Sequence, residues 1–149
     1  MQSEVKFSGQ MIGSGTRRAN PDKVAAVVNM KVPKTEKEVR QILGFFSWFR
    51  DYISDFALYA KPLTDLTDKR VSFNVPLSKI HQDAFERLKE LLCKATMDPL
   101  HIIDFSKPFH VHTDGSNYAV GCTLSQPDAN GVERSIAFAS KKFNETQQR

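Results

Sequence analysis

The chain has 149 residues, 40% of them hydrophobic, which suits one or two small globular domains with a real core. No apolar run approaches the roughly 20 residues needed to cross a bilayer, and the polar N-terminus carries no secretory signal, so we expect an intracellular protein without a membrane partner. The net charge of +4 permits a nucleic-acid partner, and the two isolated cysteines lack the close spacing of a metal site.

The N-terminal segment predicts one strand and one short helix. Residues 5–13 alternate in part, which places Phe7 and Gly9 on the same side of a strand. Gly13 and Gly15 predict a turn directly after this strand. Their spacing differs from that of a phosphate-binding glycine loop, so a hairpin turn is the favoured interpretation. A helix is expected over residues 20–28.

A capping box predicts where the next helix begins, with Thr35 as the N-cap and Glu38 three residues later. One apolar stripe follows at helical spacing, formed by Val39, Ile42, Leu43, Phe46, Phe49 and Ile53. Further aromatic residues, Trp48 among them, widen the stripe and favour a helix that is covered on more than one side. The alternative is that some of these rings, together with Arg50, face nucleic acid.

The middle of the chain predicts two more helices. Lys61-Pro62 is expected to restart the chain before a short helix around residues 63–66, and residues 71–73 are expected to be extended. A longer helix is expected from near Ser78 to Ala95. Its outer face alternates acidic and basic residues, which is typical of a solvated surface.

Three strands are expected after residue 100, over residues 108–114, 118–125 and 134–140. The connections between them are short, which favours antiparallel neighbours in a meander. The fold class is therefore α+β, with a hairpin, a helical part and a three-stranded meander. A meander of this size with one uncovered face is marginal alone, which is typical of a piece of a longer domain.

The expected strand over residues 108–114 carries the best candidates for catalytic or metal-binding residues. His110, His112 and Asp114 alternate along one strand and therefore share a face. A zinc hydrolase with this histidine pattern usually has a further histidine after the aspartate, where this chain has Gly115. Exposed histidines on a sheet are the favoured interpretation.

The second interpretation of Asp114 is a ligand of magnesium in a two-metal site. Such a site needs about three or four carboxylates around two ions. The acidic residues that follow have no evident reason to converge on Asp114; they are Asp128, Glu133 and Glu145. A turn aspartate without a metal explains Asp114 equally well.

Several segments follow one another in an order that is known from one family. They are Val5–Gln10, Pro21–Val24, Val32–Thr35, Val39-Arg40, Leu43–Phe45, Ala60–Thr64, Ala84–Lys89, Asp104–Phe109, Thr113–Ser116 and Ala137–Ser140. This order resembles the pol polyprotein of gypsy-type long-terminal-repeat retrotransposons. They span nearly the whole chain. The family's fold implies three parts: the end of the reverse transcriptase palm over residues 1–33, a helical thumb or connection over 34–101, and the start of a ribonuclease H-like domain over 102–149.

The resemblance also implies roles for individual residues. Phe7 and Gly9 would lie near the primer strand, although the neighbouring Ser8 and Gln10 stand where the family usually has leucine and histidine. The helical part would pack against a primer–template duplex or an RNA–DNA hybrid. Arg50 and Lys61 are the candidate cations for the phosphate backbone.

Asp114 matches the first metal-binding aspartate of ribonuclease H, with Gly115 in place of the usual alanine. The parent activity that this implies is RNA-directed DNA synthesis with magnesium-dependent cleavage of RNA in hybrids. The polymerase Asp-Asp pair and most ribonuclease H carboxylates are missing from this chain, so we expect the fragment alone to be inactive and to bind no Mg²⁺ stably.

The expected partners are therefore nucleic-acid duplexes and the remainder of the polyprotein, and the expected location is a cytoplasmic particle or the nucleus. The alternatives are a non-catalytic nucleic-acid-binding module and a relic of a decayed element.

Overall fold

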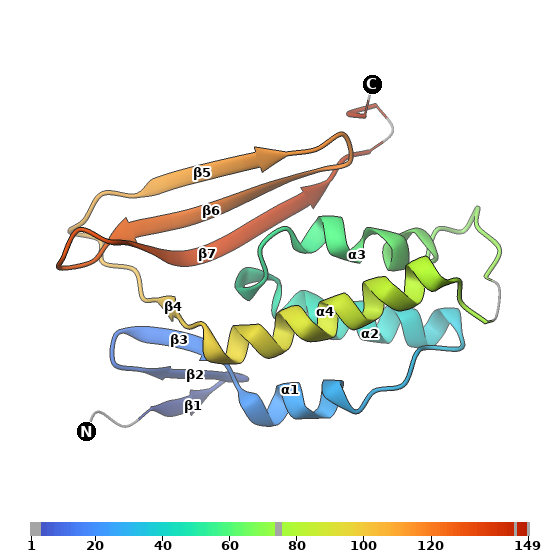
Figure 1. Ribbon diagram of the computed structural model, residues 1–149, viewed down its shortest axis with the longest axis horizontal. Coiled ribbons are helices and arrows are strands. Elements are labelled where there is room, and N and C mark those ends of the chain that lie inside the picture. The colour runs from blue at the N-terminus through green and yellow to red at the C-terminus, as the bar shows by residue number, and fades with distance from the viewer. Residues whose placement is uncertain (1–3, 74–75, 145, 149) are drawn as a thin grey trace.

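The computed structural model describes residues 4–73, 76–144 and 146–148, in which helices pack with two antiparallel sheets (Figure 1). The strands are β1 (Val5–Phe7), β2 (Gln10–Gly13), β3 (Thr16–Ala19), β4 (Leu100–His101), β5 (His110–Gly115), β6 (Ala119–Pro127) and β7 (Glu133–Lys142). The helices are α1 (Pro21–Val28), α2 (Glu36–Trp48), α3 (Phe56–Asp65) and α4 (Lys79–Met97), with a 3₁₀ turn η1 (Arg50–Tyr52). The α+β class is confirmed.

The first sheet has the order β1-β2-β3-β4, and its first three strands form a meander. Ser8 and Gly9 connect β1 to β2 with φ of 47° and 80°, and Ser14 and Gly15 connect β2 to β3 with φ of 53° and 73°. Positive φ at both central positions gives the type I′ turn that matches strand twist. The single strand expected over residues 5–13 is therefore wrong, because the chain reverses in its middle.

Side-chain caps begin α1 and α2. The Asn20 side chain accepts a hydrogen bond from the Asp22 N–H at 3.0 Å, and Thr35 Oγ1 accepts one from the Glu38 N–H at 3.2 Å. The return half of the expected capping box differs, because the Glu38 carboxylate accepts from the N–H of Lys34 at 2.6 Å. Both helices thus begin at residues that the sequence marks as N-caps.

Pro62 lies inside α3, so the expected restart of the chain at Lys61-Pro62 is wrong. A proline inside a helix removes one backbone hydrogen bond. Burial of Phe56, Ala60 and Leu63 on one face holds the helix across this defect. The expected longer helix is confirmed as α4, which ends two residues before Pro99.

The core lies where α2, α3 and α4 meet. Phe46 of α2 and Phe85 of α4 are both fully buried, and their ring centroids lie 6.5 Å apart in an edge-to-face arrangement. The apolar stripe predicted for α2 supplies much of this core, since Val39, Ile42 and Phe46 are all buried. Its last two residues, Phe49 and Ile53, are buried as well, but they lie beyond the end of α2 at Trp48, on either side of η1. None of the helices in the described residues is both long and apolar enough to cross a bilayer.

The second sheet has the order β5-β6-β7 and confirms the expected meander. Asp114 pairs with Gly121, which pairs with Ser140, so these three residues share one face. That face turns toward the helices, because Ser140 Oγ accepts a hydrogen bond from the Ala57 N–H of α3 at 2.8 Å. In Figure 1 the sheet accordingly forms one outer layer, with α3 directly beneath it.

Candidate nucleic-acid interface

The turn between β1 and β2 brings the first two predicted site residues to the surface next to α2. The Phe7 side chain is 66% exposed. The carbonyl oxygen of Gly9 accepts a hydrogen bond from the Asn20 N–H at 3.1 Å, which ties the turn to the start of α1. A Cβ at Gly9 would lie only 3.2 Å from Nε1 of Trp48, so the turn and the end of α2 form one continuous surface.

The outer face of α2 carries a narrow strip formed by Lys37, Gly44 and Trp48, which we call the α2 strip. Spacings of seven and four residues place these three on one side of the helix. Within the described part of the chain, no atom beyond the neighbouring residues and the adjacent helix backbone lies within 4 Å of a Cβ at Gly44, and Lys37 has no ion-pair partner. Trp48 is 60% exposed. The strip therefore combines a free cation, an open backbone and an exposed ring.

The structure places the other two predicted cations away from the α2 strip and gives both of them partners. The Arg50 guanidinium donates to the carbonyl oxygen of Ser140 at 2.7 Å, across the boundary between η1 and the second sheet. Lys61 pairs with Asp65 at 2.6 Å and lies 5.4 Å from the centroid of the Tyr118 ring. A role for either residue in binding nucleic acid remains a prediction.

Asp114 lines a small cavity of about 240 Å³ between α3 and the second sheet. Its Oδ1 accepts a hydrogen bond from the N–H of Gly115 at 2.8 Å. Asp55, which precedes α3, lines the same cavity, and its Oδ1 occupies the place that a Cβ at Gly121 would take. Two carboxylates from distant parts of the sequence thus approach one cross-strand pair of the sheet.

These carboxylates alone do not fit a two-metal site. Such a site needs about three or four carboxylates to balance two divalent ions. Within residues 4–73, 76–144 and 146–148, no group of three or more His, Cys, Asp or Glu side chains could hold a metal ion. Of the acidic residues considered from the sequence, Asp128 and Glu133 have other partners, and Glu145 lies outside the described residues.

The two histidines of β5 both lie against the Glu133 carboxylate. Its carboxylate accepts hydrogen bonds from the Ser125 hydroxyl and from His110, and it lies 3.2 Å from Nε2 of His112. The hydrogen bond from Ser125 and then that from His110 lower the pKa of Glu133 from 4.5 to about 2. The histidines therefore hold a carboxylate of β7 and do not converge on Asp114.

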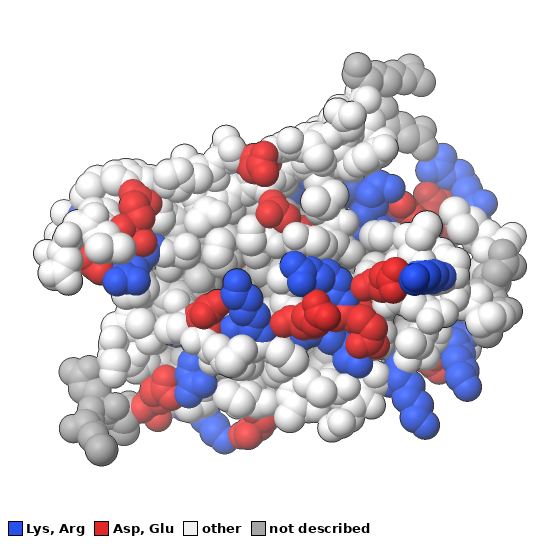
Figure 2. All heavy atoms as spheres, in the orientation of Figure 1, with Lys and Arg blue, Asp and Glu red and all other residues white. Residues whose placement is uncertain are grey.

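Charge is mixed over the face of the molecule in Figure 2, where basic and acidic side chains alternate over the helices. On α4 this mixture consists of local pairs, Arg87 with Glu90 and Lys89 with Glu86. Such pairs carry little net field. A nucleic-acid surface must therefore come from lysines that form no ion pair within the described residues, such as Lys37, and not from the overall charge.

Sequence reasoning missed the α2 strip and Asp55. It included Trp48 in the apolar stripe of the helix, but a helical projection separates Trp48 from the buried residues and aligns it with Lys37 and Gly44. This alignment of Trp48 with Lys37 and Gly44 could have revealed the α2 strip from the sequence alone. No comparable signal marks Asp55, because its approach to Gly121 depends on how α3 lies against the second sheet.

Comparison with known families identifies similarity over the second half of the chain. Residues 77–149 match the family described as an RNase H-like domain found in reverse transcriptase. Over 99% of its length the chain is 37% identical to the Pol polyprotein of the transposon opus, and 30% identical to that of the transposon gypsy, both from Drosophila melanogaster. It is 33% identical to the Gag-Pol polyprotein of koala retrovirus over 96% of its length. The chain spans only 15%, 14% and 8% of these three relatives.

Solved structures show the same arrangement of elements. The chain superposes over 98% of its length on a foamy viral protease-reverse transcriptase in complex with double-stranded DNA, with a TM-score of 0.82 and 26% identity. It superposes equally far on the foamy viral enzyme in complex with an RNA/DNA hybrid, with a TM-score of 0.79. It covers 25% and 19% of those chains.

Proposed function

We propose a function on the premise that this chain belongs to the retrotransposon Pol polyprotein family, with residues 77–149 in the RNase H-like domain found in reverse transcriptase. The function is to hold a nucleic-acid duplex as one segment of a reverse transcriptase. DNA synthesis and hybrid cleavage are activities that we propose for the longer protein. The three-part division at residues 33 and 101 stays a proposal as well.

The observation that carries this proposal is the α2 strip. Gly44 leaves the helix backbone open, so a duplex can approach it closely, while Lys37 meets a phosphate and the Trp48 ring lies against the sugars or base edges. Phe7 and Gly9 extend the same surface through the contact with Trp48. The related enzymes were solved with double-stranded DNA and with an RNA/DNA hybrid, which supports a duplex as the ligand.

The proposal is tested by fluorescence anisotropy with a labelled DNA duplex and an RNA–DNA hybrid of the same sequence. Wild-type affinity should fall as salt rises, because phosphate contacts release counterions. Gly44→Leu should weaken binding about tenfold, equivalent to about 1.4 kcal/mol. The same substitution should keep or raise thermal stability, because its Cβ meets no described atom and leucine favours helix over glycine.

Lys37→Glu and Lys69→Glu form a matched pair for the same assay. Both lysines are exposed and have no ion-pair partner among the residues that the structure describes, but only Lys37 lies on the α2 strip. We expect the first variant to bind more weakly than the second. Absence of binding at low salt, or equal losses in the two variants, would contradict the proposal.

For Asp114 we propose a narrower role, as one metal ligand that needs further carboxylates from the longer protein. Its place at the end of β5, with a free strand edge beside it, supports this role. The isolated chain should not cleave an RNA–DNA hybrid with Mg²⁺ present. Cleavage that Asp114→Asn abolishes would overturn this expectation for the isolated chain.

A further inference from the structure

A small hollow of about 260 Å³ lies between α3 and the end of β7. One wall consists of Ala57, Ala60 and Thr64, which share a face of α3. The other wall is the stretch of β7 over residues 140–142, and Arg50 of η1 lines the hollow as well. We call it the α3–β7 hollow.

Basic residues line the α3–β7 hollow, and none of its described lining residues is acidic. The Arg50 guanidinium donates to the carbonyl oxygen of Ser140, whose Oγ accepts the Ala57 N–H near the start of α3. The Lys142 ammonium pairs with the carboxylate of Asp65, the last residue of α3. These contacts place one cation near each end of the hollow, with Lys141 also in the lining.

The carboxylates around the hollow do not balance this positive charge. Arg50 donates to a neutral carbonyl group, and Lys141 makes no ion pair within the described ranges. Asp65 is shared by two lysines, because Lys61 pairs with it at 2.6 Å in addition to Lys142. Asp51 adjoins Arg50 in the sequence but does not line the hollow. The local excess of positive charge favours an anionic ligand.

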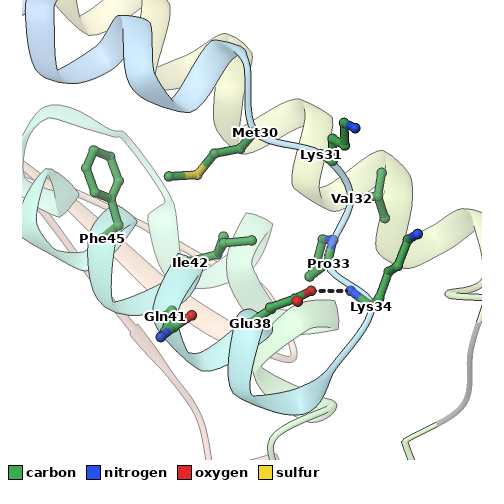
Figure 3. Close-up of a pocket in the computed structure, with 9 residues that line it drawn as sticks. All are labelled: Met30, Lys31, Val32, Pro33, Lys34, Glu38, Gln41, Ile42 and Phe45. Carbon is green, nitrogen blue, oxygen red and sulfur yellow. Dashed lines mark hydrogen bonds between the residues drawn. The ribbon is translucent and has the colours of Figure 1, made fainter.

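The larger, apolar hollow between α2 and residues 30–34 is arranged differently (Figure 3). There Lys31 and Lys34 direct their ammonium groups away from the floor, and Glu38 contributes a carboxylate to the lining. In the α3–β7 hollow, by contrast, contacts to β7 and α3 hold two of the cations in place. The charge of this smaller hollow is therefore presented to whatever enters it.

The size of the α3–β7 hollow favours a phosphate group over a whole nucleotide. Its volume lies below the range of roughly 300–1,000 Å³ that is common for small-molecule sites. Its aromatic residue, Phe56, is only 7% exposed, so the lining presents no ring on which a base could stack. Lysine and arginine contact backbone phosphates without reading the sequence.

We propose that the α3–β7 hollow binds a backbone phosphate of the same duplex that lies on the α2 strip, so that the duplex continues from α2 toward the second sheet. Arg50 follows Trp48 of the strip by two residues, so their Cα atoms are at most about 7 Å apart. Arg50 gives one N–H group to Ser140 and has others for the phosphate, while Lys141 supplies a second donor. This inference rests on the proposed function, because it requires a bound duplex.

The test is fluorescence anisotropy with the same DNA duplex and RNA–DNA hybrid at several salt concentrations. Lys141→Gln should weaken binding about fivefold and make the slope of log affinity against log salt shallower by about 0.9, because one phosphate contact is lost. Lys141→Arg keeps the charge and should restore both quantities. Lys79→Gln and Lys94→Gln are matched controls, because these exposed lysines of α4 do not line the hollow, and both variants should bind as the wild type does.

The outcomes separate this inference from the proposed function. If Lys37→Glu weakens duplex binding and Lys141→Gln binds as the α4 controls do, only the inference is overturned, whereas absence of wild-type binding at low salt overturns both. Isothermal titration of the wild type with pyrophosphate and with polyglutamate tests the other anions. Binding of either one that Lys141→Gln abolishes, with duplex affinity unchanged, would overturn the proposal and assign the hollow to a free phosphate compound or to an acidic peptide.

Discussion

Gly121 of β6 has no side chain where the Asp55 carboxylate rests against the sheet. We predict that Gly121→Ala destabilises the protein by about 1–3 kcal/mol, because the new methyl group displaces that carboxylate. Urea denaturation measures the loss. Adding Asp55→Gly should recover most of it, since glycine removes the obstructing side chain and suits the φ of 55° at that position.

Gly115→Ala is the matched control, because it lies in the same sheet and a Cβ there meets no described atom within 4 Å. It should change the free energy of unfolding by no more than the usual surface effect of about 0.5 kcal/mol. Additive effects of Gly121→Ala and Asp55→Gly would show that the two residues are not coupled. The contact between α3 and the second sheet would then differ from the one described.

The ionisation of Glu133 should make the free energy of unfolding depend on pH. Its pKa of about 2 in the folded protein lies below the ordinary value of 4.5, because Ser125 and His110 donate hydrogen bonds to the carboxylate. A lowered pKa contributes stability above pH 4.5, and this contribution is lost as the pH falls toward 2. We predict that Glu133→Gln is less stable than wild type near neutral pH and equally stable near pH 2.

Urea denaturation of both proteins at several pH values checks this prediction. In the Ser125→Ala variant, the free energy of unfolding should change less with pH than in the wild type. The substitution removes the hydrogen bond that lowers the pKa of Glu133 most. If the difference in free energy of unfolding between Glu133→Gln and the wild type stayed constant down to pH 2, the lowered pKa of Glu133 would be contradicted.

Among the elements, α2 depends most on its N-cap. Thr35 Oγ1 accepts the N–H of Glu38, so Thr35→Ala should cost about 1 kcal/mol of stability while Thr35→Ser restores most of it. Ser78 precedes α4 but makes no capping hydrogen bond to the backbone, so Ser78→Ala should cost less. Thermal unfolding monitored by circular dichroism compares the three variants. Equal losses for the two alanine variants would contradict the capping role.

The elements that could be predicted from sequence are those with long periodic patterns. The stripe of α2, the cap at Thr35 and the three strands of the meander all gave a local signal that the structure confirms. The turn at Ser8-Gly9 lacked the usual asparagine or aspartate before glycine, and the partial alternation around it favoured one strand. β4 has two residues and exists only because it pairs with β3, which no local pattern reports.

The candidate site divides in the same way. The position of Asp114 near the end of a strand could be predicted from the local pattern, and its role as a metal ligand stays a prediction. The contact of Arg50 with Ser140 and that of Lys61 with the Tyr118 ring could not be predicted, because these partners are distant in sequence. The pair of Lys61 with Asp65 is local, since the two residues are four apart on α3.

A helical projection alone places Lys37, Gly44 and Trp48 on one side of α2. The sequence does not show that this side stays open, whereas the structure buries Val39, Ile42 and Phe46 on another face of the helix.

At the scale of the whole molecule, two arginines join the last strand to earlier parts of the chain. Arg17 of β3 donates to the carbonyl oxygen of Ile136 at 3.0 Å, and Arg50 of η1 donates to that of Ser140 at 2.7 Å. Asp65 of α3 adds an ion pair with Lys142 at the end of β7. These contacts hold the second sheet against the helices as one body.

We predict that Arg17→Ala/Arg50→Ala loosens the second sheet while the helices keep their structure. Each lost hydrogen bond leaves a backbone carbonyl unpaired and costs about 1–3 kcal/mol. Hydrogen exchange should accelerate in β7 more than in α4. Arg40→Ala is the control, because the hydrogen bonds that Arg40 makes among the described residues go to Glu36 and Thr67 and not to the second sheet. Equal acceleration in both elements would indicate general destabilisation instead.

The hydrogen bond between Arg17 and Ile136 joins positions that are 119 residues apart. During synthesis, β3 therefore leaves the ribosome long before its partner strand exists. The first hairpin and the helices can assemble from nearby contacts, but the junction with β7 can form only after Ile136 has been synthesised. We therefore expect the second sheet to dock onto the helical part after the contacts within that part have formed.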